Sequence, residues 1–390
     1  RATDNFGTSS WNFVNVQNVV VNMLDDTANR LDFQIISTFS GNVEINMGDG
    51  PRVLSFSGLG LPGSANNMSG DVTVTAGAGP QTVNMAPNAI PGNPIPYISG
   101  GATTFSLGDD FDTVVNNENF VIVGGDLNLI GVNDFRYTDF LFPEPLDANL
   151  RVGGDLNMDT SVENTESFLT EGGTFHDVDI EDDLVDQERS IISGDFNFIG
   201  GDDIDHVNLN STYIIGDMNI DLGPGIPFFG DPQNITTTLD APWVLGGPWF
   251  QTDGDIFIKA GDSQLGNNVT LNGYTAKSLG VAEFEMGGLQ DNITYNLNSS
   301  FFPIAQRYDV SALMGAGDDT FEIGASVNSL AIDFGNENLS TSGTISGGTQ
   351  SASTSVQTPL IEYTDGDDAM TIANGGGVTF SQAAILPTGS

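Results

Sequence analysis

The acidic side chains are the residues of this chain whose types and spacing could support chemistry. The densest acidic group consists of Asp177, Asp179, Glu181, Asp182, Asp183, Asp186 and Glu188. Carboxylate oxygens at such positions suit Ca²⁺, which takes roughly six to eight oxygen ligands in a relaxed geometry. The chain has no EF-hand loop, and a solvated acidic loop is an equally good interpretation of this group.

Short Gly-Asp-Asp phrases form a second set of candidate cation ligands. They contribute Asp109, Asp110, Asp202, Asp203, Asp318, Asp319, Asp367 and Asp368. The phrase that begins at Gly315 (Gly-Ala-Gly-Asp-Asp-Thr-Phe) resembles the calcium-binding nonapeptide of repeats-in-toxin proteins, although Met314 stands where that pattern has its first glycine. The resemblance implies calcium at such turns, and no toxin-type β-roll, because the phrase never runs in tandem. We therefore predict that these eight residues, together with Asp177, Asp179, Glu181, Asp182 and Asp183, bind Ca²⁺ that the fold or its assembly needs.

Cysteine and histidine, which many enzymes use for covalent or acid–base chemistry, are absent or scarce in this chain. The chain has no cysteine, its only histidines are His176 and His206, and the common hydrolase, metalloprotease and phosphate-loop motifs are missing. Asp202, Asp203 and Asp205 beside His206 resemble a glycosidase carboxylate cluster, but 52 acidic residues make such a cluster expected by chance. We predict a protein with no catalytic residues, and a solenoid polysaccharide-active enzyme is our third interpretation.

The net charge restricts the partners of this chain. Its 390 residues include 52 Asp and Glu against 9 Lys and Arg, a formal net charge of −43. Repulsion of this size destabilises a compact state unless salt screens it or bound cations neutralise it. We therefore expect neither nucleic acid as a partner nor insertion into a membrane, for which no apolar run is long enough. The chain begins with Arg1, so we expect an extracellular or cell-surface protein whose leader has been removed.

A five-residue phrase, Gly-Asp-apolar-Asn-apolar, recurs along the chain and indicates β-strands that carry part of the negative charge. Strict copies begin at Gly125, Gly154, Gly194 and Gly216, and looser copies begin at Gly70 and Gly254. The alternation places the apolar pair on one face of a β-strand and the Asp and Asn on the other. The glycine permits a sharp entry into the strand, including a positive φ. Recurrence of one phrase favours an all-β parallel solenoid of stacked coils, with antiparallel β-sandwich domains as the alternative.

Stacking of the coils would align the aspartates of the phrases in one ladder on the outer face. Its members would be Asp126, Asp155, Asp195, Asp217 and Asp255. At a strand spacing of about 4.8 Å, each like-charged neighbour costs on the order of 1 kcal/mol in water. A ladder of this kind needs cations or exposure to solvent. For any one residue, capping of a turn by accepting a backbone N–H is the favoured interpretation over a metal role.

The pattern of strands and turns predicts four parts of the chain. These are an N-terminal β region over 1–100, a repetitive β scaffold over 101–339, a Ser/Thr/Gly-rich linker or loop over 340–358 and C-terminal strands over 359–390. We expect loops extruded from the scaffold at 159–190 and 223–253. The apolar segment 13–24 forms either the first strand of its own sheet or a strand supplied to a neighbouring subunit.

The Gly-Asp-Asp turns and the Gly-Asp-apolar-Asn-apolar strands together are similar to the Gly/Asp/Asn-rich repeat regions of large secreted surface proteins of aquatic bacteria. This resemblance implies an extracellular β-protein built from repeats. We therefore expect a structural subunit of an extracellular filament, sheath or surface layer that is stabilised by calcium and has other copies of itself as partners. A calcium-dependent adhesin that binds glycan is the alternative.

Overall fold

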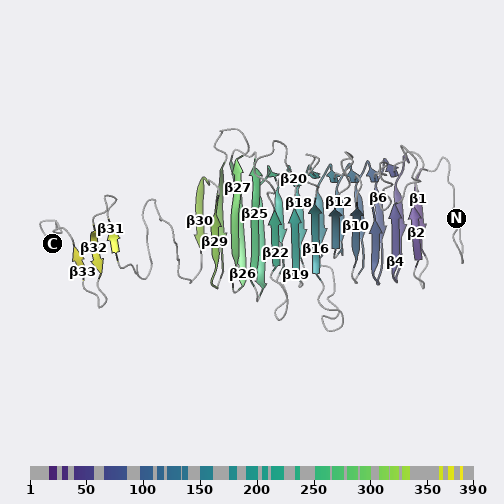
Figure 1. Ribbon diagram of the computed structural model, residues 1–390. Helices are drawn as coiled ribbons and strands as arrows, with labels where there is room; N and C mark the ends of the chain where they lie inside the picture. The colour runs from purple at the N-terminus through teal and green to yellow at the C-terminus, as the bar shows by residue number, and fades with distance from the viewer. Residues whose placement is uncertain are drawn as a thin grey trace, which may run out of the picture. The chain divides into compact units, whose positions relative to one another are not determined.

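The structure, a computed structural model, divides the chain into two compact units, residues 1–338 and 339–390, which we describe separately. The described residues are 17–23, 29–33, 39–56, 66–85, 97–108, 112–117, 121–132, 134–138, 150–160, 175–181, 190–200, 204–209, 212–223, 233–237, 251–263, 266–275, 279–288, 290–299, 307–315, 317–324, 327–333, 360–362, 368–372 and 378–380. Every regular element among them is a β-strand (Figure 1), which confirms the predicted all-β class.

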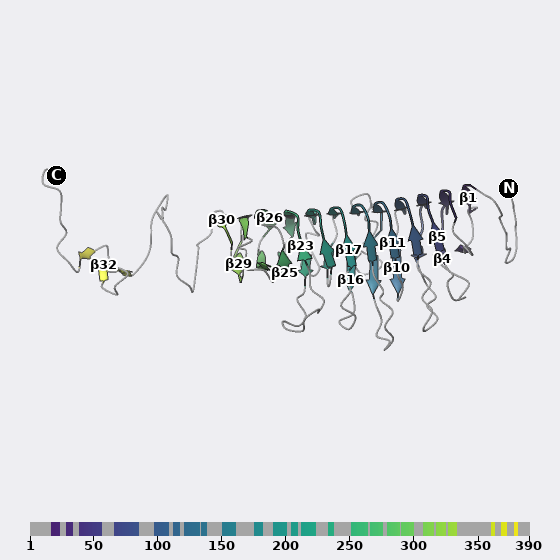
Figure 2. The same ribbon diagram turned by 90° about the horizontal axis from the view of Figure 1, so that it is seen from above.

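The first unit is a parallel β-solenoid whose strands stack in three rows. The first row is a 12-stranded sheet of β1 (Val19–Asn22), β3 (Val43–Asn46), β6 (Val72–Thr75), β9 (Thr103–Ser106), β12 (Leu127–Ile130), β15 (Leu156–Asp159), β18 (Phe196–Ile199), β21 (Met218–Asp221), β24 (Ile256–Ser263), β26 (Leu279–Gly288), β28 (Arg307–Leu313) and β30 (Ser329–Asp333). Its neighbouring strands all pair in parallel, which excludes the antiparallel sandwich for this unit. Figure 2 shows the coils following one another along one axis.

The second and third rows belong to one 18-stranded sheet. The second row is β2 (Asn29–Phe33), β4 (Arg52–Phe56), β7 (Gln81–Asn84), β10 (Thr113–Asn117), β13 (Asp134–Thr138), β16 (Phe175–Glu181), β19 (Ile204–Leu209), β22 (Gln233–Thr237), β25 (Asn267–Thr275), β27 (Asn292–Ser299) and β29 (Thr320–Ile323). The third row is β5 (Asn66–Met68), β8 (Tyr97–Ser99), β11 (Val121–Val123), β14 (Leu150–Val152), β17 (Ser190–Ile192), β20 (Thr212–Ile214) and β23 (Gln251–Thr252). The two rows join at β25, which pairs with β22 through one end and with β23 through Tyr274 and Thr275.

The core consists of columns of apolar side chains that repeat from coil to coil. In the first row Leu127, Leu156, Phe196 and Met218 occupy one register position, and all four are fully buried. Each such side chain contributes about 1.5–3 kcal/mol relative to exposure. Because side chains alternate between the two faces of a strand, a slip of one residue would expose a whole column, so the phrase fixes the register of stacking.

The segments expected as extruded loops contain strands of the scaffold among their described residues. The segments 159–190 and 223–253, expected as extruded loops, contribute β16, β22 and β23 to the rows. The acidic segment forms a strand because every three-sided coil must cross the second row, where Val178 of β16 pairs with the buried Phe135 and Val207. Strands from 1–100 and from 101–339 continue in the same rows. β1 pairs with β3, so the described part of segment 13–24 is the first strand of its own sheet.

The second unit, residues 339–390, contains an antiparallel three-stranded sheet. Its strands are β31 (Leu360–Glu362), β32 (Asp368–Ile372) and β33 (Val378–Phe380). These strands fall within the region 359–390 for which strands were predicted. The predicted linker 340–358 lies outside the described residues.

Candidate functional site

The predicted calcium ligands are distributed over several parts of the fold. Seven of them lie outside the described residues: Asp109, Asp110, Asp182, Asp183, Asp202, Asp203 and Asp367. The structure describes the backbone alone at Asp177, Asp179 and Glu181 of β16 and at Asp368 of β32. Only Asp318 and Asp319 are described with their side chains. Within the described residues, no group of three or more His, Asp or Glu side chains converges as a metal site would require.

The acidic segment of β16 lies between strands of mixed charge. Asp177 pairs with Asp134 of β13 and with His206 of β19. Asp179 pairs with Arg136 of β13 and with Asn208 of β19. The register therefore places basic residues beside two of the predicted ligands, which sequence spacing alone did not show because the paired strands are far away along the chain.

The Gly-Asp-Asp turn before β29 is the predicted ligand pair that can be described in detail. Asp318 is exposed, whereas Asp319 is partly buried and its Oδ1 accepts the backbone N–H of Asp291 at 2.9 Å. The Oδ2 atom of Asp319 is buried and has no hydrogen-bond partner among the described residues. Gly315 and Gly317 have positive φ values of 83° and 146°, so the glycines of this phrase are required by the backbone of the turn.

The aspartates of the repeated phrase form the predicted ladder, and each carboxylate links two coils. In every link the Oδ1 atom accepts the backbone N–H of the corresponding residue one coil later. The donors and acceptors are Asp155 to Asp126 (3.0 Å), Asp195 to Asp155 (2.9 Å), Asp217 to Asp195 (2.8 Å) and Asp255 to Asp217 (2.7 Å). The aspartates accept backbone N–H groups, as the favoured interpretation expected, but each N–H belongs to the next coil and not to the aspartate's own turn.

The glycine of the phrase is required for a reason other than the positive φ that the sequence suggested. None of Gly125, Gly154, Gly194, Gly216 and Gly254 is among the described glycines with positive φ. A Cβ atom at Gly154 would lie 2.0 Å from Oδ1 of Asp126, and one at Gly194 would lie 2.0 Å from Oδ1 of Asp155. Glycine is needed at these positions because the preceding coil occupies the space that a side chain would take, through a carboxylate at Gly154, Gly194 and Gly216 and through backbone atoms at Gly125 and Gly254.

The asparagines of the phrase form a second ladder on the outer face, and the pattern of residues alone did not predict its bonds. The Nδ2 of each asparagine donates to Oδ1 of the asparagine one coil earlier. The bonds run from Asn157 to Asn128, from Asn197 to Asn157 and from Asn219 to Asn197, each at 2.8 Å. The identical position of Asn in the four strict copies of the phrase was the available signal. Amide ladders satisfy donor and acceptor together, so they fasten coils without adding charge.

A third set of links, made by buried side chains, lies at the corner that leads into the second row, and no sequence signal pointed to it. Oδ1 of Asp112 accepts the N–H of Gln81 at 2.5 Å, and Oδ1 of Asp291 accepts the N–H of Asn267 at 2.9 Å. These carboxylates reach back to the preceding coil, whereas those of the phrase reach forward. All four residues are buried, so the bonds replace solvation that the backbone amides lose.

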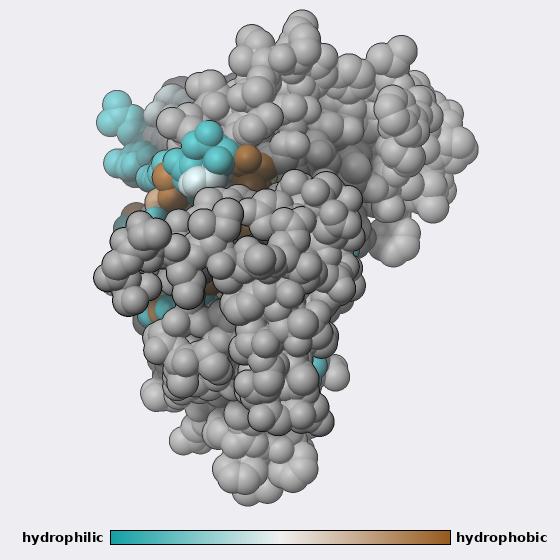
Figure 3. All heavy atoms as spheres, turned by 90° about the vertical axis from the view of Figure 1, so that its left-hand side faces the viewer, coloured by the Kyte–Doolittle hydropathy of each residue, from teal (hydrophilic) through white to brown (hydrophobic). Residues whose placement is uncertain are grey.

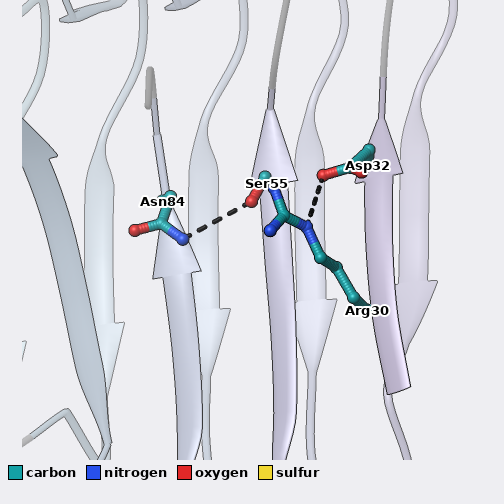
Figure 4. Close-up of polar contacts among 4 residues, drawn as sticks. All are labelled: Arg30, Asp32, Ser55 and Asn84. Atoms are coloured by element: carbon teal, nitrogen blue, oxygen red, sulfur yellow. Dashed lines mark hydrogen bonds and ion pairs between the residues drawn. The ribbon is translucent and has the colours of Figure 1, made fainter. Parts of the chain in front are cut away.

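Side-chain polar contacts in the first strands of the second row are weaker. Figure 4 shows Nε of Arg30 in β2 contacting Oδ1 of Asp32 at 2.9 Å, and Nδ2 of Asn84 in β7 donating to Oγ of Ser55 in β4 at 3.4 Å. The ion pair between Arg30 and Asp32 is solvent-exposed, and such pairs contribute about 0–1 kcal/mol. These contacts belong to the scaffold and do not form a binding or catalytic site.

Buried tyrosines contribute hydrogen bonds to the interior. The hydroxyl of Tyr308 donates to the carbonyl of Gly254 at 2.6 Å, and that of Tyr97 lies 3.0 Å from Oγ1 of Thr103. Burial raises the pKa of Tyr97 and of Tyr295, so both hydroxyls stay neutral near pH 7. Because both hydroxyl groups stay neutral, these tyrosines can pack in the interior without burying a charge.

Asp309 of β28 holds the last described strand of the first row in a pH-dependent way. Its Oδ1 accepts Oγ–H of Ser329 at 2.6 Å and Nδ2–H of Asn328 at 2.7 Å, and these bonds hold the pKa of its carboxyl below the ordinary value of 3.8. Because the pKa of this carboxyl is lower in the folded state, the ionised group stabilises the fold at pH values above its unfolded-state pKa. This stabilisation is lost as the pH falls through the folded-state pKa. We expect hydrogen-exchange protection of the β30 amides, corrected for intrinsic rates, to fall below about pH 4. Asp309→Asn should abolish this step, and an unchanged step in the variant would contradict the assignment.

Comparisons with protein families, with curated proteins and with solved structures found no match for this chain. Among the described residues, no helix is long and apolar enough to cross a membrane.

Proposed function

We propose that this chain is a structural protein, a subunit of an extracellular filament, sheath or surface layer. The observation that carries the proposal is the use of the polar side chains of the repeated phrase. Their carboxylates and amides bond to the neighbouring coil, as in the links from Asp155 to Asp126 and from Asn157 to Asn128. Side chains that fasten one coil to the next make a stiff stack, and stiffness along one axis is what a scaffold protein requires.

Calcium is the proposed regulator of this assembly, because the net charge of −43 opposes association of two copies. Repulsion between copies is screened by salt and is neutralised most efficiently by bound multivalent cations. Association of such a chain should therefore depend on divalent cations more strongly than on monovalent salt at equal ionic strength.

Of the two predicted ligands that are described with their side chains, Asp318 and Asp319, Asp319 fits a calcium ion better. Its Oδ2 is a buried carboxylate oxygen with no hydrogen-bond partner among the described residues, and a carboxylate in that state needs a cation or a proton. Ca²⁺ accepts backbone carbonyl oxygens and water as further ligands, which the Gly-rich turn from Gly315 to Asp319 can supply. In this proposal Asp319 and the turn hold the ion, and the exposed Asp318 adds negative charge beside it.

The test of the proposed function is electron microscopy of the purified chain in millimolar calcium with a matched EGTA sample. We expect ordered filaments or sheets with calcium and dispersed particles with EGTA. Dispersed particles in both samples would contradict the proposal and favour the glycan-binding adhesin, which a glycan array would then examine.

A pair of matched variants locates the calcium effect. Asp319→Asn retains Oδ1 as acceptor for Asp291 and removes one charge, whereas Asp71→Asn retains the acceptor for Ala102 and removes one charge elsewhere. We expect Asp319→Asn to need a higher calcium concentration for assembly and Asp71→Asn to match the unmodified chain. Equal shifts in the two variants would show that calcium acts through net charge and not through this turn.

A further inference from the structure

The stack ends in edge strands at both of its ends. Within the strands that the structure describes, β1 pairs only with β3 and β30 pairs only with β28. In the second row, β2 pairs only with β4 and β29 pairs only with β27. An edge strand presents N–H and C=O groups that can pair with another strand. The first row therefore has β1 and β30 as its two edge strands, and the second row has β2 and β29.

At the β30 end, apolar side chains that belong to the core columns are uncovered. Leu330 occupies the register position of Val310, yet it is 49% exposed whereas Val310 is 2% exposed. Ile332, Phe321 and Ile323 continue other core columns and are only partly buried. Figure 3 shows apolar residues in brown beside hydrophilic residues in teal.

At the β1 end, the same columns begin with apolar side chains. Val19 and Val21 of β1 start the two first-row columns that end at Leu330 and Ile332. Leu31 and Phe33 of β2 start the second-row columns that end at Phe321 and Ile323. These four residues at the β1 end are also only partly buried. Each exposed end thus offers four apolar positions at matching points of the register.

We propose that the β30 end of one copy docks onto the β1 end of a second copy, which extends the parallel ladders from one chain into the next. This inference rests on the proposed structural function and names the contact that would carry it. Continued register places Leu330 beside Val19 and Ile332 beside Val21 in the first row. In the second row it places Phe321 beside Leu31 and Ile323 beside Phe33. The two patches are different surfaces, so the contact is head-to-tail and repeats without closing, and its product is a filament.

The two ends match over two of the three rows. The third row stops at β25 and β27, where Tyr274 and Thr275 pair with Asn298 and Ser299, while the β1 end carries a bridge between Phe39 and Met68 in that row. Docking therefore rests on β1 and β2 on one side and on β30 and β29 on the other. Unpaired backbone groups and the four apolar pairs drive it, and the acidic surface opposes it until cations are present.

The absence of cysteine from the chain allows a direct test with the full-length protein. Val20 and Ala331 occupy one outward register position at the two ends, and Val20 is 57% exposed. Twelve strands spaced by about 4.8 Å separate them by roughly 50 Å within one chain, far beyond the limit of about 7 Å for a disulfide. A disulfide between Val20→Cys and Ala331→Cys can therefore form only between two copies.

We expect a mixture of the two single-cysteine variants, oxidised mildly in calcium, to give mainly the mixed dimer on a non-reducing gel. The double variant should give a ladder of covalent oligomers. The matched control pairs Val20→Cys with Ile199→Cys, because Ile199 is 46% exposed on the middle strand β18 and should cross-link no better than random collision. Equal yields for the test pair and the control pair would overturn the proposal.

Sedimentation velocity of charge variants gives the second readout. Leu330→Asp should abolish association of the full chain, whereas Ile199→Asp, which adds the same charge at an equally exposed apolar residue, should leave it unchanged. Filaments that form in calcium without the mixed disulfide would overturn end-to-end docking and leave the structural function standing. A chain that stays monomeric with and without calcium would overturn both end-to-end docking and the proposed structural function, because no second copy would then cover the β30 end.

Discussion

Replacement of Phe56 by alanine is expected to destabilise the coils at the β1 end by about 3–5 kcal/mol. Phe56 of β4 is fully buried, and its ring packs edge-to-face against Phe33 at 5.8 Å and against Tyr97 at 5.2 Å between ring centroids. The substitution removes the transfer free energy of the ring, leaves a cavity, and forfeits aromatic contacts worth about 0.5–1.5 kcal/mol each. Because the three rings come from different strands, the loss should be felt in β2, β4 and β8 together.

The measurement is urea unfolding followed by circular dichroism, with hydrogen exchange to show which coils loosen. In a stack whose coils contact mainly their neighbours, exchange should rise near β4 and stay unchanged near β27. Phe257→Ala is the control, because Phe257 is 36% exposed on the outer face of β24 and its loss should cost less than the loss of Phe56. Equal losses in the two variants would show that Phe56 does not pack in the interior.

Replacement of Gly154 by alanine is expected to cost about 1–3 kcal/mol by overpacking a corner between two coils. The new Cβ would lie 2.0 Å from Oδ1 of Asp126 and 3.0 Å from the backbone carbonyl carbon of Gly125. The carboxylate can move away only by breaking its bond to the N–H of Asp155. Either response removes the link that holds this corner in register.

A double-mutant cycle with Asp126→Ala separates this clash from a general effect of glycine on the backbone. Asp126→Ala alone should destabilise the fold by about 1.5–3 kcal/mol, the usual worth of a hydrogen bond to a charged group. In the double variant the methyl group introduced by Gly154→Ala no longer meets a carboxylate. The free energy of unfolding lost in the double variant should therefore be about 1 kcal/mol smaller than the sum of the losses in the two single variants. Additive free energies of unfolding would contradict the steric account of the glycine.

Local sequence predicted the features that repeat at one position of every coil. Alternation in the Gly-Asp-apolar-Asn-apolar phrase predicted the strands, their buried face and the parallel stacking, because Leu127, Leu156, Phe196 and Met218 share one environment. The Asp ladder followed from the same repetition. The reason for the glycine did not, because a clash with Asp126 depends on how closely two coils approach and not on the φ of Gly154 itself.

The acidic segment shows why part of the candidate site was beyond local sequence. Asp177, Asp179 and Glu181 alternate with Val178 and Ile180, a pattern that suits an exposed loop and a strand equally well. The strand forms because β13 and β19 supply partners on both sides, and those partners include Arg136 and His206. Charge alternation along one segment contains no information about the charges that stacking will place beside it.

The sequence alone determined the strand periodicity, the Asp ladder and the strong negative charge, since each depends on residue types or on spacing within one phrase. Tertiary structure alone decided the buried bonds that the N–H groups of Gln81 and Asn267 donate to Asp112 and Asp291, across 31 and 24 residues of the chain. It also decided the change from three short strands per coil to two long ones at β24 and β25. Segments of different length separate successive coils, so the residues that meet across a corner are set by the stacking of the coils and by no fixed interval along the chain.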